Sequence, residues 1–401
     1  MSPPNSRQLP RLVYIGEVPI RNISAGPALL FRLLESYPAD KLLVLESDHN
    51  KADPATELPQ VPTQKFSLLT DRLLRSRLAR LASVWVYLNA ARQGRKTVSR
   101  LQAFGAEAIL SVTHGYGAHA AAAAANAAGV PLHLLAHDDW AGTLNLPLKL
   151  RPRADREFGQ LYRNATARMP VSPAMEESYA RQYKARGTII YPSRARDCVK
   201  LVRPRLRRPN AGEFVFAYAG SAPSIGQRRT LIDFANTVAP LGVKLRVYQA
   251  LSMENLRREG LRSDNLEIAA FRPVAELHED LINRADAMYL PMSFAPEDEA
   301  NVRLCFPSKL ADYTVVGLPI LVRSPIFGTA TRWAKENPGA ALLVTDDDAS
   351  TLVSAVRTLV EDPERRESLA RAALETGEAM FGHAQVSKLF QAQLIAARAH
   401  R

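Results

Sequence analysis

Short apolar runs alternate with helical patterns along this chain of 401 residues, and this alternation constrains the fold more than any other feature. An apolar run at Leu12–Gly16 comes before a helical segment over about 26–36 and a second apolar run at Lys41–Glu46. Further strands are expected at 107–112, 131–136, 168–172 and 188–191. Strands that alternate with helices form a parallel sheet with helices on both faces. The sequence therefore predicts an α/β, doubly wound first domain.

The same alternation starts again after residue 212. A strand at 214–219 runs into Gly220, and a helix follows over about 227–238. Later elements are expected as a helix over 275–284 and strands at 243–249, 266–271, 286–290, 318–323 and 341–345. The segment 192–212 between the halves is rich in proline and basic residues, which is typical of a linker. We therefore expect domains at 1–191 and 213–384, a basic linker at 192–212 and a terminal helix within 385–401.

Composition excludes several classes of protein. The chain has 47% apolar and 23% charged residues, as in globular proteins, and is long enough for two cores. Cys198 and Cys305 lie far apart without metal-ligand spacing, which fits a reducing cytoplasm better than a disulfide framework. We find no signal-peptide pattern, no apolar run of membrane-spanning length and no nucleic-acid-binding motif. Despite a net charge of +12, we therefore expect a cytoplasmic protein with no nucleic-acid partner.

One segment concentrates the basic charge. From Arg72 to Ala106 the sequence has no acidic residue, and its basic residues are Arg72, Arg75, Arg77, Arg80, Arg92, Arg95, Lys96 and Arg100. Leucines and Trp85 recur among them at helical spacing, so we expect a basic amphipathic helix over 72–100. Such a helix can attach a protein peripherally to an anionic membrane surface. It can equally pack on its own domain with a solvated basic face.

Residues 306–319 carry the start and stop signals of one short helix. Pro307 suits the first turn, Gly317 suits the left-handed position after the last turn, and Pro319 prevents continuation. The apolar run that follows predicts a buried parallel strand.

Polar residues at the start of this helix suit an anion. Ser308 and Lys309 lie where free backbone N–H groups and the helix dipole favour a phosphate. Asp312 follows about one turn later on the same face. An ordinary capped helix with a solvated lysine is the alternative.

The string Phe-Pro-Ser-Lys-Leu-Ala-Asp-Tyr-Thr-Val-Val-Gly-Leu-Pro resembles the nucleotide-binding signature of GT-B glycosyltransferases, especially glycosyltransferase family 4. The resemblance implies two Rossmann-like domains facing across a cleft, with a nucleotide-sugar donor bound to the second domain and a last helix that crosses back to the first. By position, Pro307, Ser308 and Lys309 match the turn that holds the diphosphate. Asp312 matches the acidic residue that holds the ribose hydroxyls.

Other segments follow the order of the same family, with departures. Gly220 ends the first strand of the second domain, but Ser221 stands where the family has an arginine, and Arg228 is a nearby replacement. Arg272 lies in a segment that resembles the family's region beside the nucleotide base. Leu304, eight residues before Asp312, replaces the first of the family's two glutamates. The acidic residues Glu297, Asp298 and Glu299 could substitute for it.

His114 and His137 follow two strands of the first domain, at the carboxyl edge where α/β proteins bind ligands. Each is a candidate for a general base or a sugar contact, and a structural histidine is the alternative. The acidic run 346–348 is expected to cap a helix that begins near Ser350 rather than to bind a metal. Because basic groups can stabilise the leaving diphosphate, we expect sugar transfer without a metal.

The leading interpretation is a glycosyltransferase, by resemblance retaining, that uses a nucleoside-diphosphate sugar as substrate and no further cofactor. Its acceptor would be a glycan, a lipid-linked glycan or a small molecule. A non-catalytic protein that keeps the nucleotide site is the first alternative, and a nucleotide-sugar epimerase on the same fold is the second.

Overall fold

The computed structural model describes residues 8–23, 25–48, 53–68, 73, 76–207, 213–270 and 272–396. Arg72 and Arg75 of the basic segment, the last five residues of the expected linker and the end of the expected terminal helix lie outside these residues. The chain divides into two compact units. Unit 1 consists of 1–191 and 386–401, and unit 2 of 192–385. Each unit is described by itself.

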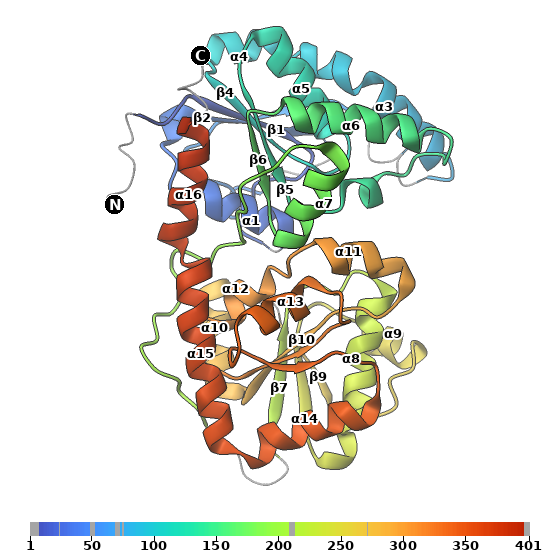
Figure 1. Ribbon diagram of the computed structural model, residues 1–401, viewed down its shortest axis with the longest axis vertical. Coiled ribbons are helices and arrows are strands. Elements are labelled where there is room, and N and C mark those ends of the chain that lie inside the picture. The colour runs from blue at the N-terminus through green and yellow to red at the C-terminus, as the bar shows by residue number, and fades with distance from the viewer. Residues whose placement is uncertain are drawn as a thin grey trace. The chain divides into compact units, whose positions relative to one another are not determined.

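Unit 1 contains a six-stranded parallel sheet with the strand order β3-β2-β1-β4-β5-β6 (Figure 1). The strands are β1 (Leu12–Gly16), β2 (Leu42–Ser47), β3 (Thr63–Phe66), β4 (Ala108–Val112), β5 (Leu132–Ala136) and β6 (Ala167–Pro170). The helices are α1 (Ala25–Leu34), α3 (Ala79–Arg95), α4 (Val98–Phe104), α5 (Gly117–Ala128), α6 (Arg151–Asn164) and α7 (Pro173–Tyr183), with short 3-10 turns η2 (Ala39–Lys41) and η3 (Trp140–Thr143). The chain runs outward from β1 to β3 and then returns to pair β4 with the other side of β1. The strand order therefore reverses between β1 and β4, where doubly wound sheets bind ligands.

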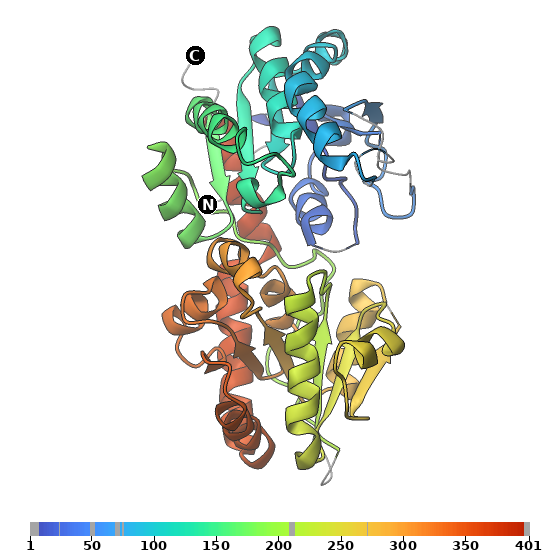
Figure 2. The ribbon, with the colours of Figure 1, turned by 90° about the vertical axis from the view of Figure 1, so that its right-hand side faces the viewer.

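Unit 2 contains a second six-stranded parallel sheet with the order β12-β11-β10-β7-β8-β9. Its strands are β7 (Val215–Ala219), β8 (Lys244–Tyr248), β9 (Leu266–Ala269), β10 (Ala287–Pro291), β11 (Ile320–Arg323) and β12 (Leu342–Val344). Its helices are α8 (Ile225–Val238), α9 (Met253–Arg258), α10 (Val274–Arg284), α11 (Glu299–Leu304), α12 (Lys309–Tyr313), α13 (Thr329–Glu336), α14 (Ala349–Glu361) and α15 (Pro363–Phe381), with 3-10 turns η4 (Ala239–Leu241) and η5 (Pro296–Asp298). Helices lie on both sides of each sheet (Figure 2). Here the order reverses between β7 and β10.

The expected α/β fold with two doubly wound sheets is confirmed, and some of its details differ from expectation. The strand β3 was not predicted, because only its last residue is buried and it lacks an apolar pattern. No strand forms at 188–191, although Thr188 and Ile190 donate backbone hydrogen bonds to the carbonyls of β6 residues Arg168 and Pro170. The last helix, α16 (His383–Ala396), begins two residues before the expected segment. Its residues from Val386 onward belong to unit 1.

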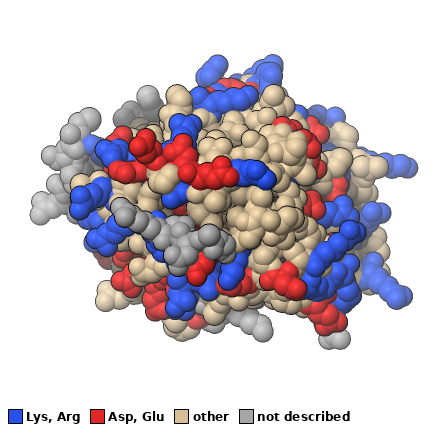
Figure 3. All heavy atoms as spheres, turned by 90° about the horizontal axis from the view of Figure 1, so that it is seen from below, with Lys and Arg blue, Asp and Glu red and all other residues tan. Residues whose placement is uncertain are grey.

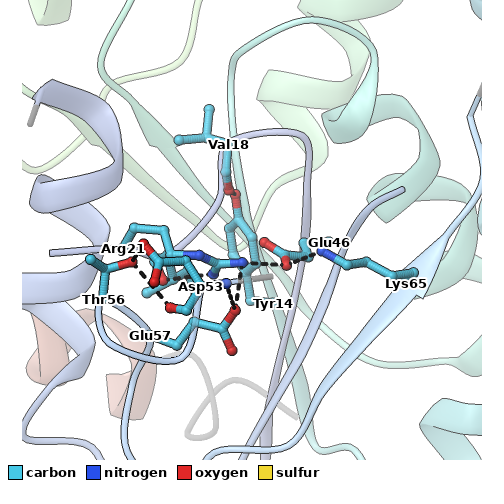
Figure 4. A network of polar contacts seen from close by, with 9 residues as sticks. Tyr14, Val18, Arg21, Glu46, Asp53, Thr56, Glu57 and Lys65 are labelled. Atoms are coloured by element: carbon cyan, nitrogen blue, oxygen red, sulfur yellow. Dashed lines mark hydrogen bonds and ion pairs between the residues drawn. The ribbon is translucent and has the colours of Figure 1, made fainter. Parts of the chain in front are cut away.

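A buried ion network fixes two loops of unit 1 to the end of β2 (Figure 4). The carboxylate of Glu46 is fully buried and accepts a hydrogen bond of 2.7 Å from Arg21, which is itself buried. Arg21 also lies 3.0 Å from Glu57, and Lys65 of β3 forms a second ion pair with Glu46. The network therefore ties residues about 20 and 57 to the sheet beside the carboxyl end of β1.

Candidate functional site

The first candidate site lies at the carboxyl end of β7, where the strand order of unit 2 reverses. The strand ends at Ala219, and Gly220 follows with a φ of +135° that side chains rarely adopt. The side chain of Lys309 crosses this glycine so closely that a Cβ on Gly220 would collide with its Cε. The ammonium of Lys309 lies 5.4 Å from the ring centre of Tyr218. A glycine is therefore needed here for Lys309 to reach the strand end.

The charge of Lys309 is poorly compensated by the protein. The residue is half-buried, and burial lowers the pKa of its ammonium to about 8. Within the described part of the chain, Lys309 forms no ion pair or hydrogen bond, and only the Tyr218 ring lies beneath it. A half-buried ammonium of this kind gains most from an anionic ligand, which would restore the electrostatic stabilisation lost on desolvation.

Tyr313 fixes α12 against β7. Its hydroxyl accepts a hydrogen bond of 2.9 Å from the N–H of Ala219 and donates one of 3.1 Å to the carbonyl of the same residue. The side chain is fully buried, so it sets the position of Lys309 one turn earlier. Sequence analysis did not single out Tyr313 as a positioning residue, although its spacing from Lys309 is helical.

The expected helix is shorter than the sequence suggested. It covers only Lys309–Tyr313, turns follow as far as Gly317, and Gly317 has the predicted left-handed φ of +65°. Pro307 lies before the helix, and its carbonyl accepts a hydrogen bond of 3.0 Å from Leu310. A helix of five residues has a small dipole, so the charge of Lys309 contributes more to anion binding here than the helix N-terminus does.

Ser308 and Asp312 flank Lys309 on the same short element. Ser308 is the N-cap residue, and its side chain forms no capping hydrogen bond. Asp312 is half-buried and follows Lys309 by three residues, so both side chains share one face. The structure thus brings together Gly220 and the predicted residues from Pro307 to Asp312.

The two predicted arginines of this site have other partners. Arg228 on α8 forms a bidentate ion pair with Glu259, with Nε–Oε2 and Nη2–Oε1 distances of 2.8 and 2.9 Å, and donates to the carbonyl of Pro223. Arg272 lies 3.8 Å from both Glu276 and Asp280, beyond the edge strand β9. Neither guanidinium contacts Lys309 in the described structure. Arg228 instead holds the loop after β7.

Ser221 contributes its backbone to the same loop. Its carbonyl accepts a hydrogen bond of 2.6 Å from the hydroxyl of Tyr218, the residue under Lys309. The loop conformation is therefore coupled to the ring that faces the ammonium.

Acidic residues near this edge mostly stabilise the protein itself. Asp298 accepts a hydrogen bond of 2.8 Å from Ser224, the N-cap residue of α8. Asp347 pairs with the buried Arg323 of β11 at 2.5 Å. Asp348 occupies the N-cap position of α14 that the sequence predicted, but its side chain forms no capping hydrogen bond and instead accepts from the Ser350 hydroxyl. Glu297 is exposed, and neither an ion pair nor a hydrogen bond involves it in the described structure.

The second candidate site lies in unit 1, at the carboxyl ends of β4 and β5. His114 follows β4, while His137 and Asp138 follow β5. Both histidines bond the same carboxylate oxygen of Asp138, at 2.8 Å from His114 Nδ1 and 3.1 Å from His137 Nε2. Their rings stack with centres 6.0 Å apart. The structure therefore joins the two predicted histidines through Asp138, the residue that directly follows His137.

The shared carboxylate raises the pKa of His114, and the histidines lower the pKa of the carboxylate. Burial alone lowers the pKa of His114, but the hydrogen bond and charge of Asp138 outweigh it and raise that pKa above its ordinary value. Burial opposes ionisation of Asp138, yet the charges and hydrogen bonds of both histidines hold its pKa far below its usual range. Neutral His114 donates from Nδ1, so its Nε2 is left as an acceptor at a partly exposed position.

These three residues could also hold a metal ion. In the described part of the chain they form the one group of three suitable side chains whose ligand atoms lie within 4.8 Å of one another. Imidazole and carboxylate suit zinc and other transition metals. The expectation of metal-free chemistry therefore stays a prediction.

Glu17 orders the neighbouring loop. Its carboxylate accepts from the backbone N–H of Gly117 at 2.8 Å and from that of Tyr116, at the start of α5. An acidic residue after β1 gives no local signal of this role, because its partners lie about a hundred residues away.

Comparison with known proteins identifies structures that share the fold of this chain, but no family or curated relative. No family model and no curated protein matches the sequence. Among solved structures, HepE from Anabaena in complex with UDP-glucose is 17% identical, with a TM-score of 0.64, over 97% of this chain and 99% of its own. Sucrose-phosphate synthase from Thermosynechococcus elongatus is 14% identical, with a TM-score of 0.67, over 97% and 100%. An α,α-trehalose 6-phosphate synthase from Burkholderia multivorans is 15% identical, with a TM-score of 0.64, over 98% of each chain.

These neighbours are GT-B glycosyltransferases, and the likeness extends over nearly all of this chain and of theirs. At such identities the likeness establishes the fold. The chain therefore has the GT-B fold that residues 306–319 implied, while membership of family 4 stays a prediction.

Proposed function

We propose that this chain is a glycosyltransferase that transfers a sugar from a nucleoside-diphosphate sugar to a glycan, a lipid-linked glycan or a small-molecule acceptor. In this proposal Lys309 and Ser308 bind the diphosphate beside Gly220, and Asp312 binds the ribose. The reaction needs no metal and no cofactor besides the donor, because the basic group compensates the charge that grows on the leaving diphosphate.

The observation that carries the proposal is the position of Lys309. Its ammonium is half-buried at the strand-order switch point of unit 2, and the described residues supply no counter-charge. A glycine with a positive φ makes room for it, and Tyr313 fixes its helix. Doubly wound sheets bind ligands at such a point, and a diphosphate supplies the missing charge. HepE, which shares the fold, binds UDP-glucose.

Calorimetry with a panel of nucleoside diphosphates and their sugars tests the proposed site. Lys309→Met should weaken the tightest ligand by about tenfold to a hundredfold, the effect of losing one charge-assisted hydrogen bond. Lys335→Met, which removes an exposed lysine from α13 of the same unit, is the matched control and should bind like the wild type. Unchanged affinity in folded Lys309→Met would place the diphosphate elsewhere.

For the chemical step, we propose that His114 hydrogen-bonds the transferred sugar through Nε2 and that configuration is retained. Asp138 fixes the tautomer that leaves this nitrogen free to accept. NMR of the first-formed product reports its anomeric configuration. An inverted product would instead assign His114 as the general base that inversion requires.

A non-catalytic nucleotide-binding protein is the second candidate. It is favoured by Leu304 in place of the family's first glutamate and by the pairing of Arg228 with Glu259, which leaves fewer charges for the donor. Tight binding of a nucleotide sugar without transfer or hydrolysis would establish it. Conversion of the free donor to its epimer would instead support the epimerase alternative.

A further inference from the structure

An apolar stripe lies on the exposed face of α3 in unit 1. Leu78 directly precedes the helix, and Leu81, Trp85 and Leu88 follow at intervals of three and four residues, so all four share one face. Their exposed fractions are 55%, 69%, 44% and 59%. Isolated exposed apolar residues are common, but four large ones in one row indicate a contact surface.

The stripe is not needed for the fold of unit 1. The opposite face of α3 is buried and packs mainly against α5, through mostly small residues together with Val86 and Tyr87: Ala82, Ser83, Val86, Tyr87, Ala90 and Gly94. Gly94 lies so close to the carbonyl of Ala120 that a Cβ would collide with it. The helix thus packs on the unit through one face, which includes the large side chain of Tyr87, and leaves the four large apolar residues of the stripe exposed on the other.

Uncompensated basic charge surrounds the stripe. Arg92 and Arg95 continue its row toward the end of α3, and Arg77 lies at its start. In the described structure none of these three, nor Arg80 or Lys96, forms an ion pair. By contrast, basic and acidic side chains are interspersed on the face of the molecule in Figure 3. The sequence has no acidic residue from Arg72 to Ala106 that could neutralise the α3 surface.

We propose that α3 docks this protein on an anionic lipid surface. Leu78, Leu81 and Leu88 would enter the boundary between headgroups and acyl chains, Trp85 would lie at headgroup level, and the arginines would pair with lipid phosphates. This narrows the basic amphipathic helix expected over 72–100 to the exposed face of α3. No helix among the described residues is long and apolar enough to cross a bilayer, so attachment would be peripheral.

The basic charge around the stripe makes an anionic bilayer a more favourable partner for α3 than a second copy of the chain. Pairing two α3 surfaces would bring like-charged arginines together in either orientation, which opposes association. An anionic bilayer covers the apolar stripe and neutralises the arginines at the same time. This proposal does not rest on the proposed sugar transfer, since α3 contains none of the residues assigned to it.

Tryptophan fluorescence of the full chain tests the proposal directly. The chain has three tryptophans, and Trp140 and Trp333 are only 1% and 2% exposed. Trp85 is therefore the one that lipid can reach. Vesicles of phosphatidylcholine mixed with phosphatidylglycerol should shift its emission to shorter wavelength, whereas vesicles of phosphatidylcholine alone should not. The shift should decrease as salt rises and should be absent in Trp85→Phe.

Vesicle sedimentation with matched variants measures the affinity. Arg92→Gln combined with Arg95→Gln should weaken binding by at least about tenfold, and so should Leu81→Ser, although both leave the buried face of α3 intact. Leu148→Ser, which removes another exposed leucine of unit 1, should bind like the wild type. Far-UV circular dichroism and the thermal unfolding midpoint serve as the folding control for every variant.

Three results would overturn the proposal. Equal binding to neutral and anionic vesicles, or no binding to either, would exclude docking on anionic lipid. Dimerisation in the absence of lipid that Leu81→Ser abolishes would assign the stripe to a second copy of the chain.

Discussion

Lys309 illustrates at the residue scale how burial can tune a binding group. Its pKa is lowered to about 8, and a diphosphate binds the ammonium rather than the neutral amine. We therefore expect nucleoside-diphosphate affinity to fall as pH rises through about 8, until the higher pKa of the bound lysine is also passed. Calorimetry from about pH 7 to about pH 9.5 measures this, and Lys309→Arg, which stays charged throughout, should show a flatter profile. A flat wild-type profile would contradict the assignment of Lys309.

Asp138 controls the pKa of His114, a second example at the residue scale. It raises the pKa of His114 against the effect of burial, which acts in the opposite direction. In Asp138→Asn the charge is lost and burial is opposed only by more distant groups, so the pKa of His114 should fall below its ordinary value. NMR titration of the imidazole measures the change, with His114→Gln used for assignment. An unchanged pKa would mean that the two side chains do not interact in solution.

At the scale of elements, the buried network around Glu46 determines whether the loops of unit 1 stay on the sheet (Figure 4). Arg21→Met leaves the buried carboxylate with Lys65 as its only cationic partner among the described residues. Removing one partner of a buried ion pair typically costs about 3–5 kcal/mol, and the remaining lysine should reduce this to about 2–3 kcal/mol. Urea unfolding, followed with a probe in unit 1, measures this loss of stability. Arg153→Met, which breaks an exposed pair with Glu157, is the control and should change the stability far less, because water and salt screen an exposed ion pair.

Elements with strong local patterns could be predicted from the sequence. The buried strands, the alanine-rich α5 and the stop at Gly317 have such patterns. The strand β3 lacks such a pattern, because its pairing with β2 decides its conformation. The break between α3 and α4 at Lys96 and Thr97 was not predicted either.

The candidate sites were predictable only in part, for the same reason. The signature in 306–319 predicts Lys309 as a site residue, and the position of Gly220 at the end of a strand predicts that it lies at the same site. The pairing of Arg228 with Glu259 joins α8 to the end of α9, and that of His114 with Asp138 joins two strand ends. Such contacts arise from the tertiary fold, so no local pattern in the sequence reveals them.

At the scale of the whole molecule, each unit carries its candidate site at the carboxyl edge of its sheet. The site of unit 2 lies where the strand order reverses, and that of unit 1 lies at the ends of β4 and the next strand, β5. Unit 2 offers a basic group for the diphosphate, and its acidic run 346–348 is engaged by Arg323 and the start of α14. Unit 1 contains the cluster of His114, His137 and Asp138, whose geometry also suits a metal ion. A test of metal dependence on the full chain therefore examines both units together.

We expect donor turnover to survive EDTA and to gain nothing from added magnesium or manganese, because Lys309 takes the role that a cation has in metal-dependent transfer. The measurement is release of nucleoside diphosphate by the full chain, before and after chelation. Loss of turnover in EDTA that manganese or magnesium restores would contradict metal-free transfer. Elemental analysis would then locate the ion, because His137→Ala should lose it if it is bound in unit 1 and keep it if it accompanies the diphosphate in unit 2.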